Sequence, residues 1–142
     1  MTTTHVPTLE HAIHQTNVWL NDVGAELGGA DHREAYRALR ATLHALRDRI
    51  PVNEAAQLAA QLPDLLRGVY YEGWSPSRTP VRYHTREQLL DRIVNEGAFA
   101  GRTEASYAAN AALAVLRRRI SAGEIAGVTA VLPADVAAFV SG

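Results

Sequence analysis

Aromatic and basic side chains alternate in one short stretch near the middle of the chain. Four of its seven Tyr and Trp residues fall within 14 positions: Tyr70, Tyr71, Trp74 and Tyr83. They are interleaved with four arginines and a histidine, which are Arg67, Arg78, Arg82, Arg86 and His84. An arginine can bind a phosphate while a ring stacks on a base, so the pattern is typical of a site for a small anionic or nucleotide-like ligand. The candidate ligand-binding residues are Arg67, Tyr70, Tyr71, Trp74, Arg78 and Arg82.

The same rings also have a structural interpretation. Tyrosine and tryptophan bury a large apolar body while keeping a polar tip near water, which suits a seam between two helical units. The second half of the chain has no such block, as expected if the block connects two units. The structural interpretation is favoured at this point, with ligand binding as its alternative.

Arginines also recur at the ends of two predicted long helices. The stretches Leu46–Ile50 and Leu116–Ile120 both place them in a last helical turn, where positive charge complements the exposed carbonyls. Glu54 and Glu124 follow four residues after the two isoleucines. We therefore predict an Arg–Glu pair across each corner, and a phosphate-binding patch at Arg117–Arg119 is the functional alternative.

The sequence contains no recognisable catalytic constellation. It has no cysteine, and all 14 basic residues are arginines, which excludes disulfides, thiolate chemistry and lysine Schiff bases. Glu10, His11 and His14 share a helical turn, but no second set faces them, so an exposed polar face is favoured over a metal site. No serine has a glycine-flanked elbow, and no phosphate-cradling glycine loop occurs. We predict no catalytic residue, no metal and no cofactor, and the chain is not expected to be an enzyme.

Every periodic segment of the chain predicts a helix. Apolar residues spaced three and four apart mark long helices over about 8–23, 31–50, 85–94 and 104–120, with shorter helices following each of the two long central ones. The predicted N-caps are Thr8, Asp31 (with Glu34), Asn53, Thr85 (with Gln88) and Thr103. Pro63 is expected either to interrupt the third helix or to start a fourth, and Pro133 is expected to open the last helix. No segment alternates as a strand does, so the fold class is all-α, with no sheet.

The chain also contains two similar halves. A shift of 70 positions aligns residues 31–66 with residues 101–136 at 14 identical positions in 36, where composition alone gives about three or four. We predict two tandem copies of a three-to-four-helix unit, packed together as one compact helical domain. The predicted division is an N-terminal tail at 1–7, a first repeat at 8–69, a linker rich in Tyr, Trp, Gly, Pro and Arg at 70–82, and a second repeat at 83–142.

Composition narrows the environment and the partners. No apolar run reaches the length of a membrane span, and residues 1–10 lack the pattern of a secretory signal, so a cytoplasmic protein is expected. The net charge of −1 gives little attraction for nucleic acid or anionic lipid. An unknown protein partner or a second copy is therefore the expected partner, with nucleic acid unlikely and no membrane.

One segment of the chain resembles the hallmark of a known family. The segment Leu66–Pro76, with sequence LRGVYYEGWSP, resembles the bacterial family catalogued as domain of unknown function 2267. The stretches Ala41–Ile50, Gln61–Pro63 and Glu124–Pro133 are similar to the same family, so the resemblance covers nearly the whole chain after about residue 8. It implies a small all-helical bacterial domain and no catalytic residues.

Two functional hypotheses follow from these observations. The first is a non-enzymatic module for protein interaction or self-association, because the helices are capped and amphipathic and no residue set requires catalysis. The alternative is binding of a small anionic or nucleotide-like ligand at the aromatic and arginine-rich linker.

Overall fold

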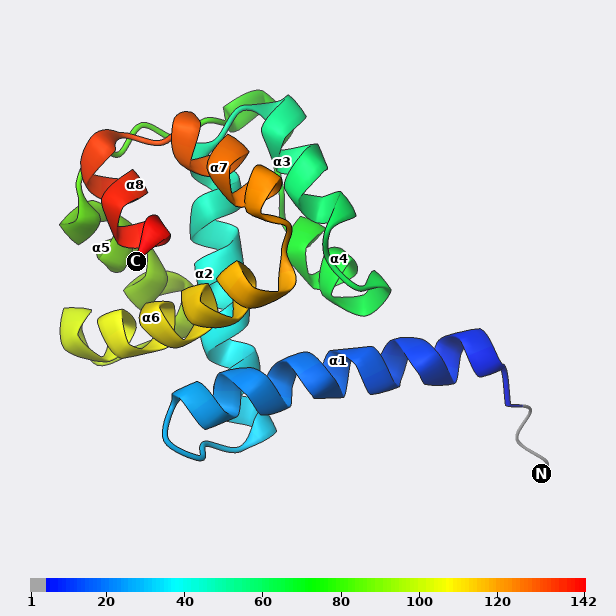
Figure 1. Cartoon of the computed structure of the whole chain (residues 1–142). Helices are drawn as coiled ribbons and strands as arrows, with labels where there is room; N and C mark the ends of the chain where they lie inside the picture. Colours follow the sequence, from blue (N-terminus) through cyan, green and yellow to red (C-terminus); the bar gives the residue numbers. More distant parts are fainter. Residues whose placement is uncertain (1–4) are drawn as a thin grey trace.

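The computed structural model describes residues 5–142, and within them it is entirely α-helical apart from one 3-10 turn and the connecting loops (Figure 1). The elements in chain order are α1 (Pro7–Glu26), α2 (His32–Arg49), α3 (Val52–Ala60), α4 (Asp64–Tyr71), η1 (Pro76–Arg78), α5 (Arg86–Gly97), α6 (Arg102–Arg119), α7 (Ala122–Ala130) and α8 (Ala134–Ser141). No strand occurs in residues 5–142, and the predicted all-α class is confirmed. None of the helices in this range combines the length and the apolar character that crossing a membrane requires.

Helix α2 is the central element of the fold. Figure 1 shows it in the middle of the molecule, and it packs against α1, α4, α5 and α6. Its three leucines Leu39, Leu43 and Leu46 are buried, and the buried face of α6 that meets it is mostly alanine, which lets the two backbones approach closely. Helix α2 is therefore covered by other helices on several sides.

The helix bounds follow the internal similarity of the sequence. Helices α6, α7 and α8 begin and end 70 positions after α2, α3 and α4. Helix α1 has 20 residues, whereas α5, which precedes the second set, has 12. Matching helix lengths are what a duplicated unit predicts.

The predicted helix starts are correct at two caps and wrong at three. The side chain of Thr85 forms the expected capping box with Gln88, and Asp31 accepts a hydrogen bond from the Glu34 backbone N–H. The other three predicted caps lie inside their helices: Thr8, Asn53 and Thr103 follow starts at Pro7, Val52 and Arg102. Proline accounts for two of these corrections, because its fixed φ suits the start of a helix and it has no N–H to satisfy. Pro133 directly precedes α8, as predicted, and Pro63 directly precedes α4, so of its two predicted roles the structure shows the start of a fourth helix.

The predicted linker is neither free nor fully irregular. Helix α4 continues through Tyr71, and the segment that follows, residues 72–85, runs along α2; we call it the strap. The Val81 backbone N–H donates to Asp48 O at 2.6 Å, and the Tyr83 hydroxyl donates to Ala45 O at 3.0 Å. The strap is therefore fastened to the C-terminal half of α2.

The predicted Arg–Glu corner pairs are absent from the described residues. Glu54 and Glu124 lie close to each other instead. Glu124 is 9% exposed, and each glutamate has a buried Oε2 without a hydrogen-bond partner. Space for Glu54 comes from Gly127, since a Cβ there would lie 2.6 Å from Glu54 Oε1. Burial, with the nearby Glu54 carboxyl, raises the pKa of Glu124 to about 7.

Glu124→Gln is expected to stabilise the protein at alkaline pH. A carboxyl whose pKa is raised in the folded state adds stability below its ordinary pKa, and this stability is lost as pH rises through about 7. At pH 8 the variant should exceed the wild type by about 1–3 kcal/mol, and the difference should shrink towards pH 5. Urea unfolding between pH 5 and pH 8 measures this. The exposed Glu87→Gln serves as control, and parallel profiles for both variants would contradict the expectation.

Candidate functional site

The tyrosines at either end of the aromatic block belong to the core. Tyr70 is 0% exposed, and its hydroxyl donates to Ala55 O at 2.8 Å. Tyr83 is also buried, with its hydroxyl on α2. Burial is the main cause that raises the pKa of each phenol. Tyr71 and Trp74 are half-buried against the same core, with ring centroids 5.3 Å apart. The structure therefore places Tyr70 out of reach of a ligand.

Arg67 also has a structural position. Its Nε donates to Ala59 O and its Nη2 to Leu62 O, both at 3.0 Å. These carbonyls lie at the C-terminal end of α3, where a helix leaves acceptors without partners. Arg67 therefore joins the end of α3 to α4 and is separate from the arginines of the strap.

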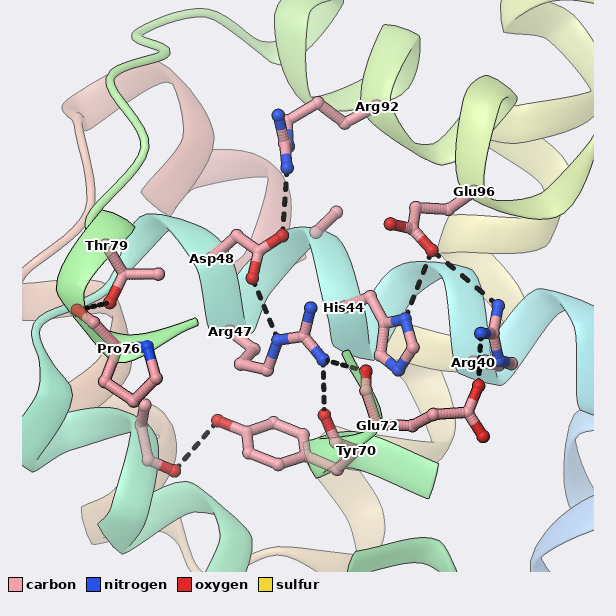
Figure 2. A network of polar contacts seen from close by, with 12 residues as sticks. Arg40, His44, Arg47, Asp48, Tyr70, Glu72, Pro76, Thr79, Arg92 and Glu96 are labelled. Atoms are coloured by element: carbon pink, nitrogen blue, oxygen red, sulfur yellow. Dashed lines mark hydrogen bonds and ion pairs between the residues drawn. The ribbon is translucent and has the colours of Figure 1, made fainter. Parts of the chain in front are cut away.

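A buried polar network holds the strap and α4 on α2 (Figure 2). Arg47, which is 2% exposed, donates through Nη1 to Tyr70 O at 2.7 Å and to Glu72 O at 2.8 Å. Its Nε donates to Asp48 Oδ1 at 2.9 Å, and the other oxygen of Asp48 accepts from Arg92 of α5 at 2.9 Å. Arg47 thus donates to carbonyl groups at the C-terminal end of α4 and anchors this end to α2.

His44 continues this network and was not singled out by the sequence. It is 2% exposed, and its Nδ1 lies 3.1 Å from Glu96 Oε2 (Figure 2). Its Nε2 lies 2.7 Å from Val69 O. Because Glu96 belongs to α5 and Val69 to α4, this buried imidazole links α2 to both helices. The partners lie 25 and 52 positions away, which explains why no local pattern revealed the site.

A basic surface pocket lies where the strap passes the end of α2. Its cavity volume is about 330 Å³, and its lining, which we call the arginine pocket, consists of Arg49, Ser77, Arg78, Thr79, Pro80, Arg82 and His84. No carboxylate is among these residues. The pocket unites two of the predicted ligand residues, Arg78 and Arg82, with two residues that were not in the predicted set, Arg49 and His84.

Local structure explains why these side chains gather. Pro76 opens η1, which ends at Arg78, and the Thr79 hydroxyl donates back to Pro76 O at 2.9 Å. Beyond it, Arg82 is exposed while its neighbour Tyr83 is buried, as expected where successive side chains of an extended chain point to opposite sides. The buried ring of Tyr83 thereby directs the Arg82 side chain outwards.

The three arginines of the pocket differ in how they are held. Arg49 donates through Nε to Tyr83 O at 2.7 Å, and its guanidinium carbon lies 5.8 Å from the centroid of that ring. Its two terminal nitrogens have no protein partner among the described residues. Arg78 and Arg82 are exposed, and within residues 5–142 neither side chain has an ion pair, hydrogen bond or cation–π contact. The pocket thus presents one positioned guanidinium and two without partners.

The alternative patch at Arg117–Arg119 is already occupied by protein groups. Arg117 donates to Val140 O at 2.9 Å, which repeats the contact of Arg47 with Tyr70 O in the first half. Arg118 pairs with Glu26, and Arg119 pairs with Asp22, each at 2.6 Å. These arginines connect α6 to α8 and α1, and the charges of Arg118 and Arg119 are balanced by carboxylates.

The described residues form an all-helical domain with a basic surface pocket. The chain belongs to the family described as "Uncharacterized conserved protein (DUF2267)", whose model matches residues 16–139. This match confirms the family resemblance found in the sequence. A comparison with curated proteins gave no match.

Proposed function

We propose that this protein binds a small anionic ligand in the arginine pocket and performs no chemistry on it. The observation that carries this proposal is the lining itself: three guanidinium groups and a histidine without any carboxylate. Within residues 5–142, the arginines outside the pocket, except Arg33 and Arg86, are paired with Asp or Glu or bonded to carbonyl oxygens. Arg86 lies over the ring of Phe139. Of the arginines of the described chain, Arg33 is the only other one that lacks any such partner or an aromatic contact.

Electrostatics supports an anion as the occupant. Like charges gathered without counter-charges repel one another, and a bound anion removes that repulsion while accepting charge-assisted hydrogen bonds. Each hydrogen bond to a charged group contributes about 1.5–3 kcal/mol. The net charge of −1 gives little nonspecific attraction for nucleic acid, so a small ligand suits the pocket better.

The double variant Arg78→Gln/Arg82→Gln is expected to bind inorganic phosphate at least about tenfold more weakly than the wild type, because two charge-assisted contacts are lost. Both side chains are exposed and have no protein partner within residues 5–142, so the melting temperature should stay the same. Isothermal titration calorimetry at fixed ionic strength measures the affinity.

The matched control for this variant is Arg33→Gln/Arg118→Gln, which removes the same charge from other sites. It also removes one member of the Arg117–Arg119 patch. Affinity close to that of the wild type is expected for the control. Equal losses in both double variants would show an effect of overall charge and would contradict the proposal.

A second candidate function, self-association, is supported by the exposed face of α1. Val6, Leu9 and Ile13 are 44%, 60% and 54% exposed, and their spacing continues the stripe of Leu20 and Val23, which is buried in the bundle. In Figure 1 the N-terminal part of α1 extends past the other helices. We propose that a second copy of this chain covers the stripe.

Leu9→Gln/Ile13→Gln is expected to convert a weak dimer into a monomer at protein concentrations of about 100 μM, because it removes the centre of the apolar stripe. Sedimentation equilibrium measures the mass. The control Val52→Gln/Val131→Gln changes two other exposed valines, which are 40% and 38% exposed, and should leave the dimer intact. A wild-type protein that stays monomeric throughout this range would contradict the second candidate.

A further inference from the structure

We infer that the arginine pocket selects a phosphoryl group on a compact ligand and does not read a nucleobase. This inference rests on the proposed function, because it specifies the anion that the same pocket binds. It follows from the charge of the lining, from the way Arg49 is held, and from where the aromatic rings lie.

The charge of the lining matches a phosphate ester better than a carboxylate. Arg49, Arg78 and Arg82 provide three permanent positive charges, with His84 beside them and no acidic residue in the lining. A phosphate monoester carries a charge of about −1.5 to −2 near neutral pH and has three strong acceptor oxygens. A carboxylate group has one charge and two oxygens. The two charges of a dicarboxylate such as succinate lie on separate groups, so neither group presents three oxygens and a double charge at one point.

The donors are also arranged for several oxygens at once. The Nε of Arg49 is used by Tyr83 O, which fixes the guanidinium and leaves its Nη1 and Nη2 for a ligand. Arg78 and Arg82 retain their full sets of N–H groups. The planar fork of arginine pairs with two oxygens of a phosphate, and Ser77 and Thr79 add hydroxyl groups to the lining.

No tyrosine or tryptophan face is available for a base in this pocket. Tyr83 is buried and covered by Arg49, and neither Tyr71 nor Trp74 is part of the lining. Proteins that bind bases of single strands without sequence preference usually stack them on exposed rings. The cavity volume of about 330 Å³ is near the lower end of the range for ligand sites, which also favours a compact ligand.

The test compares four probes on the whole protein by calorimetry at equal ionic strength: inorganic phosphate, ribose 5-phosphate, AMP and succinate. Phosphate and ribose 5-phosphate should bind, and succinate should bind at least about tenfold more weakly. AMP should bind within about threefold of ribose 5-phosphate, because no tyrosine or tryptophan face is open to its base. Arg78→Lys/Arg82→Lys, which keeps the charge but loses the forks, should weaken phosphate binding several-fold.

The outcomes separate this inference from the proposed function. Succinate binding as tight as that of phosphate would overturn the inference, and so would AMP binding more than about tenfold tighter than that of ribose 5-phosphate. In either case the proposed anion site would still stand if the binding depends on Arg78 and Arg82. Binding that is unchanged in Arg78→Gln/Arg82→Gln, or no binding of any probe, would overturn the proposed function and this inference together.

Discussion

Replacing Arg47 by methionine is expected to lower the free energy of unfolding by about 3–5 kcal/mol, the usual cost of leaving a buried charge partner uncompensated. Methionine fills much of the same space but offers no donor, so Tyr70 O and Glu72 O lose their bonds at the end of α4. Asp48 keeps only Arg92 as its charged partner. Urea unfolding followed by circular dichroism measures the loss.

The internal similarity of the chain supplies the control for this variant. Arg117 lies 70 positions after Arg47 and makes one corresponding bond, to Val140 O, from a half-buried position without an acidic partner in the described structure. Arg117→Met is therefore expected to cost only about 1 kcal/mol. Similar losses for the two variants would show that the network around Arg47 adds nothing to the shared helix-end contact.

Replacing Tyr70 by alanine is expected to cost about 3–5 kcal/mol, because it opens a cavity in the core and removes the hydroxyl donor to Ala55 O. Tyr70→Phe keeps the ring and should cost about 1–2 kcal/mol through the lost hydrogen bond. Chemical unfolding of both variants measures these values. The phenylalanine variant should bind phosphate as the wild type does.

This pair of variants distinguishes the structural interpretation of the ring from the ligand-binding one. A fully stable Tyr70→Ala protein that no longer binds phosphate would mean that the ring serves the ligand. Loss of stability in the alanine variant, with unchanged binding in the phenylalanine variant, is the result that its buried position predicts.

The helices could be predicted from the sequence because their signals are local. Apolar spacing and the Thr85–Gln88 capping box depend on residues within a few positions of one another, and the structure confirms both. The prolines that open α4 and α8 act through their own backbone, so they too could be recognised. The wrong caps at Thr8 and Asn53 arose where a proline competes with a side-chain cap for the same start.

Only part of the candidate site could be predicted from the sequence, because burial of the linker depends on contacts with distant residues. Nothing near Tyr83 in the sequence shows that its hydroxyl reaches Ala45, 38 positions earlier. That contact holds the Tyr83 ring in the core, whereas Arg82, the preceding residue in the sequence, is exposed. Arg49 was interpreted as a helix-end charge, and its place in the pocket follows from its bond to Tyr83 O, across 34 positions.

The most direct measurement of the anion site uses the side chains themselves. Because all 14 basic residues are arginines, a ¹⁵N-resolved NMR titration with inorganic phosphate can follow the Nε–H signals of every permanent cation in the chain. Saturable shifts confined to Arg49, Arg78 and Arg82 are the predicted result. Shifts that never saturate, or that are largest at Arg117–Arg119, would contradict it.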